Sequence, residues 1–177
     1  MAEDCRLAER AQRGDRDAFQ QLLERHYDTA YRVAYRFLGH IEDAEDVAQD
    51  VCLALPAKLG SFQANSRFST WLYTVVVNAC RDHLRKRRST EKLQLSYGMF
   101  RDMDGADCVD DSGRLDWLNQ ALTALEPALR ETAILVLSED LSHAEAAHVL
   151  GCAEGTVSWR MAEVRKRLKA LAESSDA

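Results

Sequence analysis

Residues 68–88, FSTWLYTVVVNACRDHLRKRR, begin like an apolar helix and end in an almost continuous run of positive charge. The chain of 177 residues nevertheless has a formal net charge of −6. Residues 61–92 hold 7 basic and 2 acidic side chains, a net charge of +5, whereas residues 1–60, 93–112 and 113–177 are each net negative. A local patch, rather than the net charge, sets the attraction for a polyanion. The stretch therefore indicates a nucleic-acid-binding surface in an acidic protein.

Six side chains around this stretch recur at spacings of three and four, so they share one face of the predicted helix. This basic stripe consists of Trp71, Thr74, Asn78, Arg81, Arg85 and Arg88. Arginines bind phosphates, an asparagine amide can read a base edge, and an aromatic ring can stack on an unpaired base. Phe62 and Phe68, near the preceding loop, supply further rings, and Ser69 is the expected N-cap. The alternative is a core helix with a solvated basic end, in which single rings such as Phe68 are core residues.

Two amphipathic helices precede the basic one. Apolar residues recur at helical spacing from Asp17 to Leu38, and Gly39 predicts the end of that helix. A second helix is expected from about Ile41 to Lys58, with Pro56 kinking it or ending it early. Nothing alternates with period two for long enough to predict a strand, so we expect an all-α protein.

The second of these helices carries EDAEDVAQDV, residues 42–51, which gathers carboxylates on one side. The acidic face consists of Asp43, Glu45, Asp46, Gln49 and Asp50. Such a cluster can bind a metal ion, can be a solvated helix face, or can dock on a basic protein surface. No histidine joins it at ligand spacing, and periodicity alone leaves these alternatives open.

Residues 142–172 carry a second DNA-binding signal, a helix-turn-helix pattern. Ser142 and Glu145 form a capping box at the start of a short helix, and Gly151 follows that helix. The next helix has a core stripe and a polar outer side, which suits insertion into a major groove. The expected DNA contacts are Thr156, Ser158, Trp159, Arg160, Ala162, Glu163, Arg165 and Lys166. Glu163 either reads a base or pairs with a neighbouring basic side chain, and an ordinary helical hairpin could show the same pattern.

Between the two DNA-binding signals, residues 93–112 are rich in Asp, Gly and Ser and have no sustained period. We expect two small helical domains, residues 1–92 and 113–177, joined by a flexible acidic linker of residues 93–112. Five cysteines without a CxxC favour neither disulfides nor a metal, and His148 with Cys152 lacks further ligands. No catalytic set, cofactor site or metal site is expected. The chain lacks an apolar leader and any apolar run of about 20 residues, so we expect a cytoplasmic protein.

Taken in order, five blocks resemble the extracytoplasmic-function (ECF) sigma factors of bacterial RNA polymerase. The blocks are RGDRDAFQQLLERHY, EDAEDVAQDVCLAL, FQANSRFSTWLYTVVVNACRDHLRK, LEPALRETAILV and LSHAEAAHVLGCAEGTVSWRM. Only the linker and the tails lie outside them. Trp159, where the family often has serine, and Glu163, where a basic residue is common, depart from the family pattern, as does Pro56.

The resemblance implies a sigma-2 bundle, a sigma-4 helix-turn-helix domain and no enzymatic activity. The acidic face would dock on the β′ clamp helices of core polymerase, which decides among the three alternatives above. The basic stripe and its loop would open the −10 element and capture a flipped base, with Phe62 and Asn78 at the pocket. The sigma-4 domain would read the −35 element and contact the β flap. Promoter DNA and an anti-sigma factor are the further partners expected of a chain that is a monomer when free. The competing hypothesis is an autonomous helix-turn-helix regulator that binds an operator without polymerase.

Overall fold

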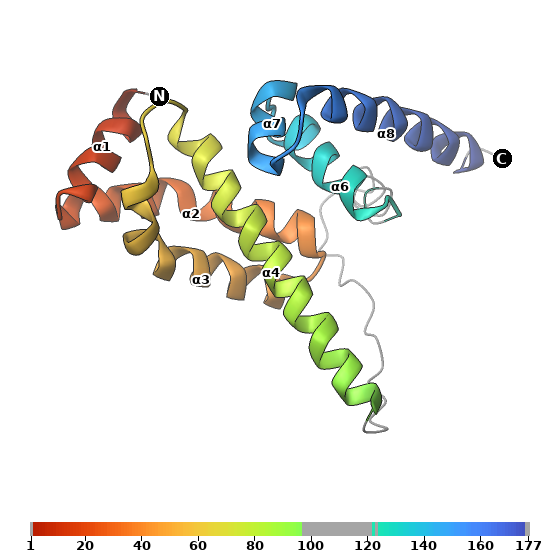
Figure 1. Cartoon of the computed structure of the whole chain (residues 1–177), viewed down its shortest axis with the longest axis horizontal. Helices are drawn as coiled ribbons and strands as arrows, with labels where there is room; N and C mark the ends of the chain where they lie inside the picture. Colours follow the sequence, from red (N-terminus) through yellow and green to blue (C-terminus); the bar gives the residue numbers. More distant parts are fainter. Residues whose placement is uncertain (1, 97–121, 123, 176–177) are drawn as a thin grey trace. The chain divides into compact units, whose positions relative to one another are not determined.

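The computed structural model describes residues 2–96, 122 and 124–175, and the regular elements of these residues are all helical (Figure 1). The chain divides into two compact units, Met1–Ala106 and Asp107–Ala177. The expected fold class, two small all-α domains, is confirmed. Within the described residues no helix combines the length and the apolar character needed to cross a membrane.

The first unit is a bundle built around its second helix. Its elements are α1 (Ala2–Gln12), α2 (Arg16–Leu38), α3 (Ile41–Lys58), the short 3-10 helix η1 (Leu59–Ser61) and α4 (Phe68–Ser96). Helix α2 packs against α1, α3 and α4, and α3 also packs against α4 (Figure 1). The bundle thereby holds the acidic α3 beside the basic α4.

Local signals determine where α2 begins and ends. The Asp15 carboxylate accepts a hydrogen bond from the Ala18 amide at 3.0 Å, which satisfies one of the free N–H groups of the first turn. At the other end Gly39 adopts φ of 76°, a left-handed conformation that glycine reaches without strain, and its N–H bonds to the Tyr35 carbonyl. The helix predicted for residues 17–38 is therefore confirmed to within a residue.

The structure excludes one of the two effects expected of Pro56, and it contradicts the expected N-cap of α4. Pro56 does not end α3, which continues to Lys58, because a missing N–H so near the C-terminus removes only one hydrogen bond of the final turns. Ser69 is not the N-cap of α4: the helix already begins at Phe68, and the Arg67 carbonyl accepts from the Trp71 amide at 3.2 Å. Arg67 therefore occupies the capping position through its backbone.

The core of the first unit consists of the apolar faces of its helices. Five residues of α3 are buried, namely Ala44, Val47, Ala48, Val51 and Leu55. Leu72 and Val76 of α4 are also buried, at 1% and 0% exposed. On α2, Val33 and Phe37 are in the core, whereas Tyr27 is 38% exposed.

The second unit is a helix-turn-helix domain. Its elements are α6 (Pro127–Ala133), the π-helical turn η2 (Ile134–Ser138), α7 (His143–Leu150) and α8 (Glu154–Ser175). The predicted capping box of α7 is present: the Glu145 amide donates to Ser142 Oγ at 3.2 Å, and the Ser142 amide donates to Glu145 Oε2 at 3.0 Å. Gly151, with φ of 68°, makes the turn into α8.

The predicted linker, residues 93–112, is outside the described residues except for 93–96, which belong to α4. Residues 113–121 and 123, the start of the second predicted domain, also lie outside them. Leu122 and Leu125 are described and buried, and the Arg130 guanidinium donates from Nε to the Leu122 carbonyl at 3.0 Å. Burial lowers the pKa of Arg130.

Candidate nucleic-acid interface and acidic docking face

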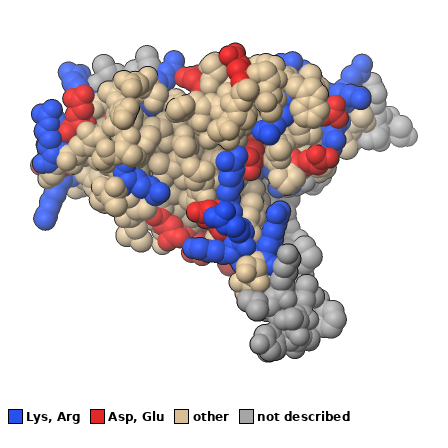
Figure 2. Space-filling model, in the orientation of Figure 1, with Lys and Arg blue, Asp and Glu red and all other residues tan. Residues whose placement is uncertain are grey.

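The basic stripe lies along α4, and its side chains become more exposed toward the arginine end. Trp71, Thr74 and Arg81 are half-buried, whereas Asn78, Arg85 and Arg88 are exposed. Blue side chains gather over the C-terminal half of α4 next to the red side chains of α3 in Figure 2. The structure therefore brings the amide and the guanidinium groups to one accessible face of a single helix.

Two side chains of the basic stripe are engaged by their own helix. Arg85 forms a surface ion pair with Asp82, one turn earlier on α4, and both side chains are mostly exposed. Such a pair contributes little stability and opens readily when a phosphate competes for the guanidinium. The Thr74 hydroxyl donates to the Thr70 carbonyl at 3.3 Å, so it is engaged by its own helix.

The rings expected to stack on bases form a cluster instead. Phe62 and Phe68 are 5% and 2% exposed and therefore belong to the core. Their centroids lie 5.6 Å and 5.5 Å from that of Trp71, which is half-buried over them. Edge contacts of this kind stabilise the cluster beyond the apolar area that it buries. In this conformation Trp71 is the accessible ring, and a base contact by Phe62 requires the loop of residues 62–67 to move.

Helix α1 holds that loop in place, through a residue that sequence reasoning missed. Gln12 Nε2 donates to the carbonyls of Leu59 and Phe62 at 2.8 Å and 2.9 Å. The two bonds fix the backbone at the entry to the loop, almost 50 residues away along the chain. No local pattern reveals such a contact, because a glutamine at the end of a helix is ordinarily solvated.

His26 of α2 lies beneath the same cluster. Its ring centroid is 4.9 Å from that of Phe68, and its Nε2 is buried without a hydrogen bond, 3.7 Å from an Asp4 carboxylate oxygen. Burial lowers the pKa of His26, because desolvation disfavours the charged imidazolium more than Asp4 favours it. The neutral ring is thus the form that the fold accommodates.

One member of the acidic face is engaged inside the bundle. The Asp43 carboxylate lies 3.1 Å from His83 Nε2 and 3.0 Å from Arg87 Nη1 of α4. Its side chain is 24% exposed, so these pairs are partly shielded from water. Asp43 therefore joins α3 to α4, and its availability to a partner is reduced. This pairing could not be read from spacing, since it joins residues about 44 apart.

The other members of the acidic face, Glu45, Asp46, Gln49 and Asp50, are exposed. Leu53, one turn further along α3, is 80% exposed, although the sequence prediction did not include it. A single exposed apolar side chain is common on protein surfaces, so Leu53 adds apolar area to this side of α3 without by itself marking an interface. The described residues contain no group of three or more His, Cys, Asp or Glu side chains able to hold a metal ion.

On α8 the core and the candidate DNA contacts lie on opposite sides. Val157, Met161 and Val164 are fully buried, as predicted. Ser158, Trp159, Ala162, Arg165 and Lys166 are exposed, and Thr156, Arg160 and Glu163 are half-buried. His143 Nδ1 lies 2.9 Å from Ser158 Oγ, which joins the start of α7 to α8.

Of the two roles considered for Glu163, the structure favours pairing with a neighbouring basic side chain over reading a base. Its Oε1 accepts from Arg167 Nε at 3.0 Å, and the same guanidinium reaches Glu126 at 3.3 Å. The hydrogen bond that Arg167 donates to Glu163 raises the pKa of the Arg167 guanidinium. A carboxylate held by a neighbour on its own helix is less available to accept from a base.

Comparison with known proteins places this arrangement in a family. The family model of Sigma-70 region 2 matches residues 22–90, from α2 into α4. The ECF RNA polymerase sigma factor SigM of Mycobacterium tuberculosis is 36% identical over 160 residues, which cover 89% of this chain and 79% of that protein. The chain belongs to the ECF RNA polymerase sigma factors.

This ECF sigma factor is also similar to other sigma factors over most of its length. The RNA polymerase sigma factor NccH of Alcaligenes xylosoxydans xylosoxydans is 34% identical over 184 residues, covering 97% of this chain and 96% of that protein. Among solved structures, the sigma factor RpoE of Bartonella quintana, in complex with the anti-sigma factor NepR, has a TM-score of 0.74 and 30% identity. That match covers 88% of this chain and 96% of RpoE. The family is one of transcription initiation factors.

Proposed function

We propose that this ECF sigma factor directs core RNA polymerase to promoters and takes part in opening them, without an enzymatic activity of its own. The observation that carries the proposal is the division of charge in the first unit. Exposed carboxylates lie along α3, whereas the exposed Asn78, Arg85 and Arg88 lie along α4, which packs beside it. One protein can therefore bind a basic partner and a polyanion at once.

In this proposal the acidic face, with Leu53 beside it, docks on the β′ clamp helices of core polymerase. Asp43 contributes mainly by joining α3 to α4. The basic stripe binds the −10 element, where the arginines hold phosphates and Asn78 reads a base edge. Trp71 is the ring available to an unpaired base, and Phe62 and Phe68 support it from below. Helix α8 reads the −35 element with its outer side.

An anti-sigma factor is a further proposed partner, since the related RpoE was solved in complex with one. The sigma factor acts where the polymerase and the chromosome are, so we assign it to the cytoplasm. We infer that the domains extend over residues 1–92 and 113–177, joined by residues 93–112.

The test is transcription of fragmented genomic DNA by the host's core polymerase with and without the purified sigma factor, followed by sequencing of the RNA 5′ ends. We expect new 5′ ends at a fixed distance downstream of one shared pair of sequence elements. DNA footprints by the chain alone, with no new transcripts when polymerase is added, would instead establish the autonomous regulator.

A further inference from the structure

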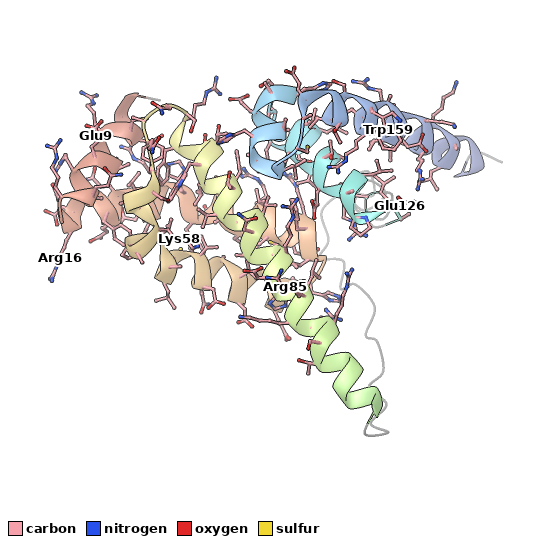
Figure 3. All side chains as sticks on the ribbon, viewed as in Figure 1. Glu9, Arg16, Lys58, Arg85, Glu126 and Trp159 are labelled. Atoms are coloured by element: carbon pink, nitrogen blue, oxygen red, sulfur yellow. The ribbon has the colours of Figure 1, made fainter. Side chains whose placement is uncertain are left out.

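Trp159 of α8 is the most exposed tryptophan that the structure describes, with 65% of its surface accessible (Figure 3). Across the described residues, the structure records neither a hydrogen bond nor a ring contact for its indole. Tryptophan buries more apolar area than other side chains when it finds a partner. The indole of Trp159 is therefore available to a ligand outside the chain.

The position of Trp159 on the helix identifies the side from which that ligand approaches. Successive residues of an α-helix are about 100° apart. Trp159 is two residues from both Val157 and Met161, which are fully buried, so it projects away from the core. The same outer line contains Gly155, Trp159, Ala162 and Lys166, which we call the outer ridge.

The neighbours of Trp159 on the outer ridge are small. A Cβ atom added at Gly155 would meet nothing within 4 Å, and Ala162 is exposed. The indole therefore stands above the helix surface with open space on both sides along the axis. A narrow feature of a ligand can reach both edges of the ring, and the backbone of α8 can approach that ligand closely.

The charge of α8 indicates what kind of ligand this is. Between Glu154 and Leu171 the helix has five basic residues (Arg160, Arg165, Lys166, Arg167 and Lys169) and two acidic ones (Glu154 and Glu163), a net charge of +3. A basic helix favours a polyanion. The major groove of DNA is about 12 Å wide, admits an α-helix, and presents one apolar group on its base edges, the C5-methyl group of thymine.

We propose that Trp159 selects thymine within the −35 element by packing its indole against the C5-methyl group. The inference rests on the proposed function, which assigns α8 to the −35 element. It adds the chemical group that is read and the side chain that reads it. Removal of one methyl group from such a contact should weaken binding about fourfold.

The experiment uses holoenzyme assembled from core polymerase and the full-length chain. Transcription from duplexes randomised over the −35 region first identifies the preferred sequences. Each selected thymine is then replaced by deoxyuridine, which keeps the base pair and the O4 acceptor but lacks the methyl group. The templates are transcribed with the original chain, with Trp159→Ala and with Trp159→Phe. Leu137→Ala serves as a matched control, because Leu137 is 52% exposed in the same unit but lies outside α8.

We expect the original chain to lose about fourfold in promoter affinity with deoxyuridine at one or two positions. Holoenzyme with Trp159→Ala should bind the thymine template about fourfold more weakly than the original does. Its affinity should not change when thymine is replaced by deoxyuridine. Trp159→Phe should retain part of the sensitivity to the thymine methyl group, and Leu137→Ala should retain all of that sensitivity.

The proposal is overturned if the original chain is indifferent to deoxyuridine at every selected thymine, if selection yields no thymine, or if Trp159→Ala remains sensitive to the methyl group. A Trp159 that instead faces a protein partner produces the first result. A holoenzyme that starts at no template refutes the proposed function itself. Defined initiation without dependence on the methyl group refutes only the role of Trp159.

Discussion

Reversing two charges on the acidic face, Asp46→Lys with Asp50→Lys, should weaken the binding of this sigma factor to core polymerase without unfolding it. Both carboxylates are exposed, and across the described residues the structure records no ion pair for either. The fold therefore loses no internal contact. In the proposed complex, two attractive charges become repulsive.

The expected loss of binding free energy can be worked out from the exposure of these two side chains. Because they are exposed, the effective dielectric constant around them is close to that of water. A partner charge about 5 Å away contributes about 0.8 kcal/mol, and physiological salt roughly halves that value. Reversal turns an attraction into an equal repulsion, about 0.9 kcal/mol for each position. The two positions together cost about 1.8 kcal/mol, roughly a twentyfold rise in Kd.

The assay is a titration of core polymerase with labelled sigma factor at low and at high salt. The affinity of the original chain should fall as salt rises, whereas that of the double variant should fall less. Glu24→Lys with Asp28→Lys makes the same change of charge on exposed positions of α2 and should bind nearly normally. The docking role of the acidic face is refuted if both double variants bind alike, or if neither differs from the original chain at low salt.

Three further substitutions test the remaining sites. Asn78→Ala should reduce discrimination at the −10 element by about 1–3 kcal/mol in promoter-opening assays while leaving polymerase affinity intact, since its exposed amide holds no core contact; equal losses in both would contradict a reading role. Glu163→Arg should raise transcription from most −35 sequences by a similar factor, because a positive charge near DNA replaces a carboxylate that is held by Arg167 and reads no base. A changed order of preference in a randomised −35 library would show instead that Glu163 reads a base. The pKa of His26 is lowered by burial, so its contribution to stability is present above its ordinary value of about 6.5 and is lost as the pH falls below it. His26→Gln should therefore flatten the decline of unfolding free energy on acidification in urea titrations, and an unchanged pH profile would count against the buried neutral ring.

The sequence predicts the helices well wherever local signals determine them. The period of 3.6 residues identifies the buried face of α3 and of α8, because the same residues that repeat along the chain pack together in the core. The capping box at Ser142 involves residues only three apart, so it too is visible in the sequence. Gly39 and Gly151 mark helix ends because their left-handed backbone favours glycine.

The sequence does not predict features that depend on contacts between distant residues. Helix α1 was not expected, because its place depends on Leu7 and Ala8 packing into the bundle and on Gln12 binding the loop before α4. Asp43 has the same spacing as its exposed neighbours, and only the packing of α3 on α4 reveals its partners. Periodicity thus locates the residues that can contact a partner. It does not show which of them are already paired with other side chains of the same fold.

The cluster of Trp71, Phe62 and Phe68 gives this sigma factor a built-in optical reporter. The indole of Trp71 is packed edge-on against Phe62, the first residue of the loop that must move if Phe62 is to contact a base. Separation of the rings would transfer the indole into water and shift its emission to longer wavelength. The chain has two other tryptophans, Trp117 and Trp159, and phenylalanine at both positions would leave Trp71 as its single tryptophan. With a red-shifted tryptophan analogue at this position, excited at a wavelength that the tryptophans of core polymerase do not absorb, stopped-flow mixing of the holoenzyme with unlabelled promoter DNA would then time the movement of the loop against the melting of the duplex.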